Sequence, residues 1–225
     1  MGQYYKTLLI SENGSVAMLN PRDFDFGSKL TENSWIGNDY VNAALCLLQD
    51  NPLRVAWIGD YSYDPYEGEY AGIPEEQFLR FYKMAWGNEA LQPIPPSFFD
   101  KQKLDNICTL KTNRKFIINH TKKQFIHMGE YIAQNSYEEK GLFENGEYNE
   151  SAVETWCVHP LPILTACGNG RGNGDYAEWQ PDFANVGTWA FDLIEYTGSV
   201  PADYTAATFH FSDQNDPILA SSAPV

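Results

Sequence analysis

The segment Cys167–Asp175 has the residue pattern with the clearest potential for chemistry. It reads Cys-Gly-Asn-Gly-Arg-Gly-Asn-Gly-Asp and directly follows an apolar run. Glycine loses much backbone entropy on folding, so this density requires a reason. In one interpretation, successive N–H groups surround an anion, with Arg171 as a charged fork and Asp175 holding a hydroxyl, a base edge or a metal. In the other, the segment is a tight loop that needs several positive φ angles.

The first interpretation assigns a set of ligand-binding residues. They are Asn169, Gly170, Arg171, Gly172, Gly174 and Asp175, with Trp57 or Trp35 stacking on a base. The known glycine motifs do not fit, because no Gly-Lys-Ser/Thr follows as in a P-loop and no helical pattern follows as in a Rossmann fingerprint. The calcium nonapeptide turn acts as an array, whereas this turn stands alone.

Three side chains are candidates for catalysis: Asp60, His159 and Asp175. Asp60 ends the strand-like Trp57-Ile-Gly-Asp, and a carboxylate at the end of a strand is a common position for a site in α/β sheets. Strand alternation places Cys157 and His159 on one face about 7 Å apart, too far for a direct bond. We therefore expect Cys157 in the core and keep His159 as an acid/base candidate.

Other familiar site patterns are absent from the sequence. The acidic residues that follow Asp60 match no named metal loop, so they are either a divalent-cation site or a solvated loop, and we predict no metal site. Those residues are Asp64, Glu67 and Glu69. No Gly-x-Ser-x-Gly elbow occurs. The four cysteines form no Cys-x-x-Cys pair. His120, His127 and His210 have no ligand spacing and are expected to be structural, and the sequence names no cofactor.

The elements that must position these residues indicate an α+β fold. Asn13-Gly14 between two apolar runs predicts a hairpin, and residues 116–127 predict a second. Asn38 or Asp39 begins a helix that runs to about Gln49, and Pro74 opens another. We expect a mixed or mainly antiparallel sheet built from hairpins, with two or three packed helices.

Smaller segments complete the expected chain. Strands are predicted at 54–58, 155–159, 163–166, 188–196 and 207–211, and a short helix at about 129–135. Residues 1–215 are expected to form a single domain. The polar segment 137–151 is the expected flexible insertion, and residues 216–225 the C-terminal tail.

Charge is the most informative property of the composition. The chain of 225 residues has 15 basic and 30 acidic residues, a net charge of −15. Such a surface repels nucleic-acid phosphates and anionic membranes, and it suits a basic protein partner. The N-terminus does not resemble a signal peptide, and no apolar run is long enough to span a membrane. We therefore expect a cytoplasmic protein.

Several short motifs together resemble a group of uncharacterised proteins from bacteria and their phages. They are Met1-Gly2 with Tyr4 and Lys6, Gly27-Ser-Lys-Leu-Thr-Glu32, Trp35-Ile-Gly-Asn38, Ala56-Trp-Ile-Gly-Asp-Tyr61, Asn119-His-Thr-Lys-Lys123 and Cys167–Asp175. The resemblance spans about Met1 to Tyr196. It implies a prokaryotic or phage cytosolic setting, and by association the binding or sequestering of a signal molecule or a host protein.

Three functions remain open. The first is a binding protein for a small phosphate-bearing or nucleotide-like ligand at the glycine-rich turn. The second is a metal-assisted hydrolase or transferase that uses Asp60, Asp175 or His159. The third is an acidic interaction protein that binds and inhibits a basic host protein, with the tyrosine-rich segment 60–70 as its face.

Overall fold

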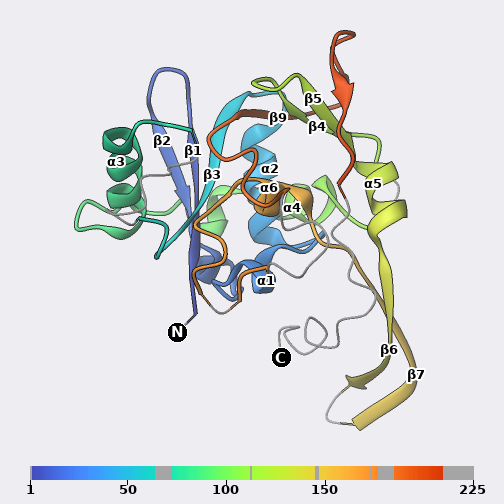
Figure 1. The fold of residues 1–225 in the computed structure, drawn as a ribbon. Coiled ribbons are helices and arrows are strands. Elements are labelled where there is room, and N and C mark those ends of the chain that lie inside the picture. Colours follow the sequence, from blue (N-terminus) through green and yellow to red (C-terminus); the bar gives the residue numbers. More distant parts are fainter. Residues whose placement is uncertain are drawn as a thin grey trace.

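A computed structural model describes residues 2–63, 72–111, 113–144, 147–172, 174–176 and 185–209. In these residues helices pack against a mostly antiparallel sheet (Figure 1). The predicted α+β class is confirmed.

The main sheet has the strand order β10-β5-β4-β9-β3-β1-β2, and β8 also pairs with β3. The bounds are β1 Tyr5–Ile10, β2 Val16–Leu19, β3 Leu53–Gly59, β4 Phe116–Asn119, β5 Gln124–His127, β8 Ala166–Cys167, β9 Leu193–Thr197 and β10 Thr205–Ala206. The pairs β3–β8 and β5–β10 are parallel, and the other ladders of this sheet are antiparallel.

The helices lie between and around these strands. Their bounds are α1 Leu30–Asn33, α2 Asp39–Leu48, α3 Glu75–Trp86, α4 Lys101–Ile107, α5 Met128–Asn135 and α6 Pro160–Leu164, with 3₁₀ turns η1 Pro21–Phe24 and η2 Pro96–Phe98. The predicted cap of α2 is present, because the Asn38 side chain accepts from the N–H groups of Tyr40 and Val41.

The two central strands are covered on both faces. Leu9 and Trp57 pack in one core cluster with α2, whereas Leu8 and Ile58 pack in a second cluster with Phe78 of α3. Successive strand residues point to opposite faces, so a strand covered on both sides must be apolar throughout. This accounts for the apolar runs at residues 8–10 in β1 and 55–58 in β3.

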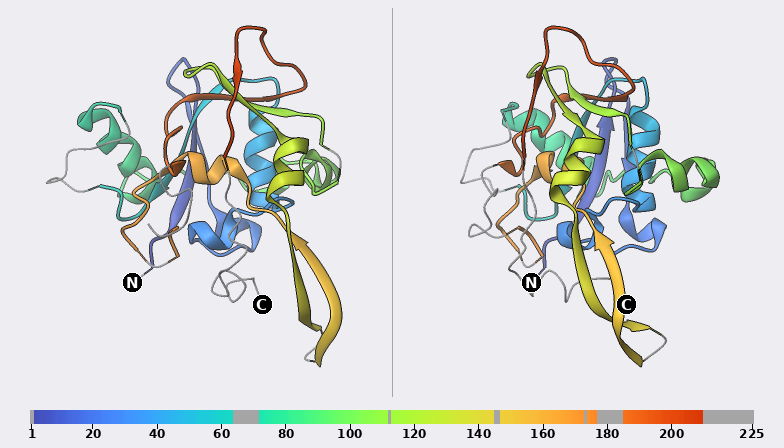
Figure 2. Two further views of the ribbon diagram at one scale, coloured as in Figure 1. Left: turned by 45° about the vertical axis from the view of Figure 1, so that its right-hand side comes forward. Right: turned by 90° about the vertical axis from the view of Figure 1, so that its right-hand side faces the viewer.

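A second, two-stranded sheet extends away from this body. It consists of β6 (Tyr137–Glu144) and β7 (Glu147–Trp156), and we call it the arm (Figures 1 and 2). The ring of Trp35 anchors its base, with ring centroids 6.4 Å from Tyr137 and 5.3 Å from Trp156. The segment 137–151, expected as a flexible insertion, thus forms most of a β ribbon.

Several predicted elements differ from the structure. The expected strand 155–159 is present only at its start, where β7 ends at Trp156, and the expected strand 163–166 only at Ala166, where β8 begins. Helix α6 lies between them, because Pro160 occupies a helix N-terminus and His159 caps it. The expected strand 188–196 begins only at Leu193, since turns precede it and Phe191 has a positive φ of 63°. Residues 207–209 of the expected strand 207–211 are not in a strand, since β10 ends at Ala206. The predictions for residues 210–211, for His210 and for the 216–225 tail lie outside the described residues.

Helices α1 and α4 were also not predicted. Helix α4 begins after Asp100, whose carboxylate accepts from the Lys103 N–H at 2.8 Å. No helix in the described ranges is long and apolar enough to cross a membrane.

Candidate functional site

The glycine-rich turn does gather bare N–H groups around an anion, but the anion is the chain's own Asp175. One carboxylate oxygen of Asp175 accepts from the N–H groups of Gly170, Arg171 and Gly172 at 2.9, 3.0 and 3.1 Å. The other oxygen accepts from the Tyr5 hydroxyl at 2.8 Å. Three of the amides that the phosphate-binding hypothesis requires are therefore already satisfied by this carboxylate, which favours the interpretation of the segment as a tight structural loop.

Burial raises the pKa of Asp175, while the hydrogen bonds from Tyr5 and the three amides lower it. The opposing effects describe a half-buried carboxylate that serves as an internal cap. The same carboxylate and burial raise the pKa of Tyr5.

Two glycines of this turn lie where a larger residue would clash or would strain the backbone. A Cβ on Gly172 would lie 2.6 Å from the backbone N of Gln3, and Gly174 has a φ of +90°. The Arg171 guanidinium donates to the carbonyl of Tyr61 at 3.0 Å. The turn thus holds the start of the chain and the end of β3 together, as the structural interpretation of the glycines requires.

Trp57 and Asp60 also have structural surroundings. Trp57 is fully buried, and its ring meets Tyr40 edge to face, so it cannot stack on a ligand base as predicted. Asp60 accepts from the Tyr4 N–H at 2.9 Å, while its own N–H donates to the Tyr4 carbonyl. It closes the end of the β1–β3 pair. The acidic residues at 64, 67 and 69 lie outside the described residues.

His159 is not placed to transfer protons to a substrate. Its side chain is fully buried, and Nδ1 accepts from the Leu161 N–H at 3.1 Å as the cap of α6. Burial lowers the pKa of His159 to about 3, so the ring stays neutral. The thiol of Cys157 is likewise buried, and burial raises its pKa to about 12. The expectation of a core Cys157 holds, whereas the acid/base role of His159 is wrong.

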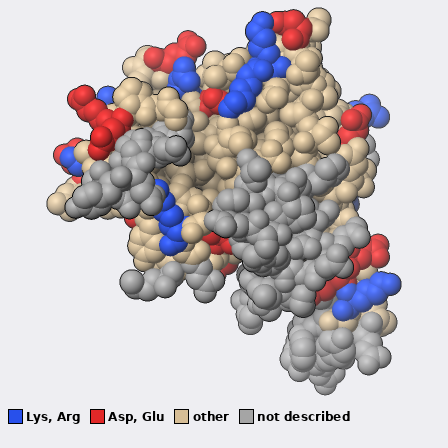
Figure 3. Space-filling model, viewed as in Figure 1, with Lys and Arg blue, Asp and Glu red and all other residues tan. Residues whose placement is uncertain are grey.

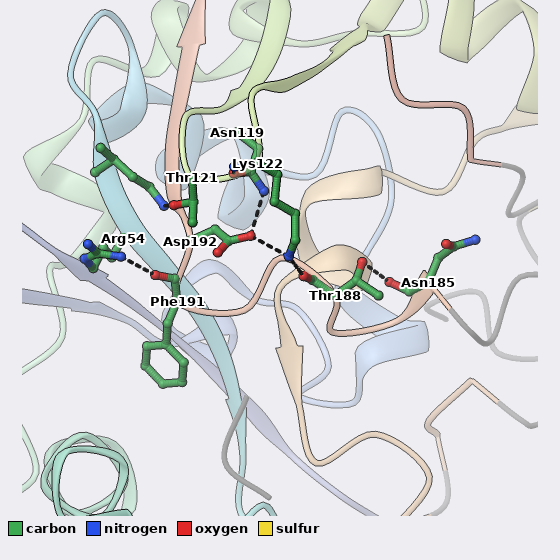
Figure 4. A network of polar contacts seen from close by, with 9 residues as sticks. Arg54, Asn119, Thr121, Lys122, Asn185, Thr188, Phe191 and Asp192 are labelled. Atoms are coloured by element: carbon green, nitrogen blue, oxygen red, sulfur yellow. Dashed lines mark hydrogen bonds and ion pairs between the residues drawn. The ribbon is translucent and has the colours of Figure 1, made fainter. Parts of the chain in front are cut away.

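The structure does assemble one polar network around Asp192, at the tip of the β4–β5 hairpin (Figure 4). Asn119 and Lys122 both donate to the same carboxylate oxygen of Asp192, at 2.7 and 2.9 Å. Lys122 also donates to the Thr188 carbonyl, and Leu193 N–H donates to the Thr121 hydroxyl. Figure 4 shows these side chains converging from the hairpin and from the loop before β9, so the network holds the hairpin tip on β9.

A second chain of polar contacts lies beside it. His120 Nε2 is 2.8 Å from the Glu195 carboxylate, and Nδ1 is 2.9 Å from the Tyr204 hydroxyl. A carboxylate, an imidazole and a hydroxyl in line resemble the geometry of a nucleophile activated by a base. Each contact also joins the hairpin tip to β9 or to the loop before β10. We therefore assign these residues this joining role.

The candidate binding site is a groove of about 720 Å³ between the segment 110–114 and helix α5. It is lined by Leu110, Lys111, Asn113, Arg114, His127, Gly129, Glu130, Ile132 and Ala133. Its volume is in the range of small-molecule sites. Among the described residues, Lys111 and Arg114 form no ion pair, and both side chains are exposed.

Local structure positions these groups. Asn113 is buried and donates to the Tyr196 hydroxyl at 2.9 Å, which fixes the loop that bears Lys111 and Arg114. Opposite, Gly129 allows close approach, because a Cβ there would lie 2.4 Å from the Asn113 carbonyl. The groove therefore has two walls that are fixed to each other.

His127 contributes a defined donor to this groove. Its Nδ1 accepts from the Glu130 N–H at 3.1 Å as the cap of α5. In the neutral ring the hydrogen must then reside on Nε2. The Glu130 carboxylate lies 3.6 Å from Nδ1, and its side chain is 76% exposed. The groove thus combines three cationic or N–H donors with one solvent-directed carboxylate and the apolar side chains of Leu110, Ile132 and Ala133.

The sequence contains a signal for this site that whole-chain charge conceals. Residues 101–123 contain seven basic residues and one acidic residue, leaving eight basic and 29 acidic residues in the rest of the chain. On the face shown in Figure 3, acidic side chains gather at the left over α3, and basic ones lie at the top over the β4–β5 hairpin. A windowed count of charge would have located this segment.

No protein-family model, curated protein or solved structure matches this chain. The described residues also contain no group of three or more His, Cys, Asp or Glu side chains that could hold a metal ion. The class of the protein therefore follows from its fold and groove alone: an acidic α+β protein with one locally basic surface.

Proposed function

We propose that this protein binds a small phosphate-bearing ligand, nucleotide-like in size, in the groove of Lys111, Arg114 and His127. The observation that carries the proposal is the positive charge of Lys111 and Arg114, which form no ion pair with a described residue, at a groove of ligand size in a chain of net charge −15. It keeps the ligand class expected from the sequence and moves the site from the glycine-rich turn.

The chemistry of the groove suits such a ligand. Arg114 presents a planar fork that matches phosphate oxygens, and Lys111 adds a point charge. The His127 ring adds an N–H donor. The apolar side chains of Leu110 and Ile132 can cover a base or a short acyl group, as in most small-molecule sites.

The alternative of a hydrolase or transferase is less well supported. Its three candidate residues are held by the fold, since Asp175 caps the turn, Asp60 binds the Tyr4 N–H and His159 caps α6. The setting expected from the sequence, the cytoplasm of a bacterium or a phage-infected cell, stays part of the proposal. It is supported by four free cysteines.

The test is a thermal-shift and calorimetric titration with inorganic pyrophosphate and a panel of nucleoside mono-, di- and triphosphates. A ligand at 100 times its Kd stabilises a protein by about 2.7 kcal/mol. We expect a shift with at least one of these ligands and a loss of at least tenfold in affinity in the double variant Lys111→Ala/Arg114→Ala.

The matched control is Arg80→Ala/Lys83→Ala, which removes the same two charges from the exposed surface of α3. It should leave the affinity within about twofold, because α3 and α5 lie on opposite sides of the molecule (Figure 1) and solvent screens exposed charges. No binding of any phosphate ligand, or an equal loss in both double variants, would refute the proposal.

A further inference from the structure

The arm has the properties of an incomplete sheet. In the described residues β6 and β7 pair only with each other, so the outer edge of each strand has backbone N–H and C=O groups without a ladder partner. Isolated two-stranded ribbons are marginally stable, and free edges are sites at which another strand can add. Figure 2 shows the arm extending clear of the body in both views.

The charges of the arm oppose its own formation. Residues 137–156 contain six glutamates and one lysine. The register places Glu139 opposite Glu154 and Glu144 opposite Glu147. Like charges directly opposite each other destabilise a β pair. Because the arm contains such like-charge pairs, a cationic group that lies beside them would stabilise it.

The two faces of the arm differ near its base. Glu154 and Val153 are adjacent in β7, so their side chains point to opposite faces. Val153 is 52% exposed, which is unusual for an aliphatic residue in this protein. One face therefore presents the Glu139–Glu154 pair, and the other presents an exposed aliphatic side chain.

We propose that the arm docks an extended basic segment of a partner protein, which adds to its edge as a further strand. On the edge of β7, alternating residues of that segment would place lysine or arginine beside Glu154, with Glu139 one strand further on the same face, and an aliphatic side chain beside Val153. Backbone hydrogen bonds supply affinity in this mode, and the alternating side chains supply specificity. The proposal is independent of ligand binding in the groove.

Charge decides which occupant fits. A second copy pairing through its own arm would bring two ribbons of six glutamates each together, which is electrostatically unfavourable. A basic partner is instead attracted by the arm and by the net charge of −15. The aromatic anchor of Trp35, Tyr137 and Trp156 fixes the base of the arm, so the docking edge is held to the body.

The experiment uses two ten-residue peptides of identical composition, one alternating lysine and valine and one with five lysines followed by five valines. Binding of each labelled peptide to the full chain is measured by fluorescence anisotropy at two salt concentrations. We expect the alternating peptide to bind at least tenfold more tightly, because only it can place all lysines on one face of an added strand.

Variants separate the arm from the charge of the whole molecule. Glu139→Gln/Glu154→Gln should weaken the alternating peptide at least tenfold and raise the Tm of the free protein, since it removes a like-charge pair. The matched control Glu75→Gln/Glu76→Gln, in the exposed first turn of α3, should stay within twofold. Equal binding of the two peptides, or an equal loss in the control, would overturn the proposal.

Sedimentation of the free chain tests whether a second copy of the chain occupies the arm. We expect a monomer at the concentrations used for binding. A dimer that Glu139→Gln/Glu154→Gln dissociates would show that a second copy is the occupant, and that outcome would also overturn the proposal.

Discussion

The glycine-rich turn and the basic groove differ in how well the sequence alone indicates their capacity to bind a ligand. The turn is the most conspicuous motif in the chain, yet its amides and its arginine are bonded to Asp175 and to the Tyr61 carbonyl. The groove is inconspicuous in sequence, yet Lys111 and Arg114 form no ion pair with any described residue. A dense motif thus marks a backbone with special requirements, whereas binding capacity depends on which polar groups the fold leaves available.

Two histidines show the same contrast between a polar group that is available and one that the fold encloses. His127 and His159 each cap a helix through Nδ1. His127 lines the groove, whereas the second ring nitrogen of His159 is buried and has no hydrogen-bond partner among the described residues. The two histidines therefore have the same capping role, but a ligand can reach His127, whereas His159 affects only the stability of the fold.

The largest effect is expected from Asp175→Ala. Removal of this carboxylate leaves three N–H groups and the buried Tyr5 hydroxyl without their acceptor, and we expect a loss of about 3 kcal/mol in the free energy of unfolding. Urea unfolding measures the loss. The control Glu12→Ala removes an exposed carboxylate at a residue without a positive φ and should change stability by less than about 0.5 kcal/mol.

If the ligand binds in the groove and not at the glycine-rich turn, Asp175→Ala should leave ligand affinity unchanged. At a temperature where the variant is folded, its affinity for pyrophosphate should match that of the parent protein within about twofold. A loss of ligand affinity in Asp175→Ala, with none in Lys111→Ala/Arg114→Ala, would return the site to the glycine-rich turn.

The next effect concerns His159 and pH. Because burial lowers its folded pKa to about 3 from an ordinary value of 6.5, the unfolded state binds the proton first. Stability should therefore be complete above pH 6.5 and fall as the pH drops toward 3, by about 3 kcal/mol at pH 4. Asp175 acts in the opposite direction, since its raised pKa favours the native state on acidification.

The variant His159→Asn tests this assignment. Asparagine is a good helix N-cap and does not titrate, so the variant should show a shallower decline in stability between pH 6.5 and 4. Urea unfolding at a series of pH values gives the slope. An unchanged slope in His159→Asn would mean that other groups cause the decline. The control His127→Asn, at a partly exposed site, should leave the slope largely unchanged.

The smallest effect is expected from Glu130→Gln, which removes the one carboxylate that lines the groove. Its side chain is mostly exposed, so screening limits its repulsion of an anionic ligand. We expect pyrophosphate affinity to rise about two- to threefold, most clearly at low salt, by calorimetric titration. A decrease would show that Glu130 contacts the ligand through a hydrogen bond that its carboxylate accepts.

The sequence by itself determined the features that depend on neighbouring residues. Asn13-Gly14 specifies the first hairpin, Asn38 caps α2, and the apolar runs of β1 and β3 indicate strands that are covered on both sides. These follow from turn chemistry, capping and side-chain period, which act over a few residues. Where such signals competed locally, as at His159-Pro160, the helix prevailed over the predicted strand.

The tertiary structure alone decided which groups remain available for binding. Asp175 meets Tyr5 across 170 residues, and Asn113 meets Tyr196 across 83. Such contacts decide that Trp57 is buried, that the glycine-rich turn is occupied by its own carboxylate, and that Lys111 and Arg114 lie beside His127 at one groove. Hydrogen-bond satisfaction is a property of the whole fold, so local pattern could identify the glycine-rich turn but could not show what fills it.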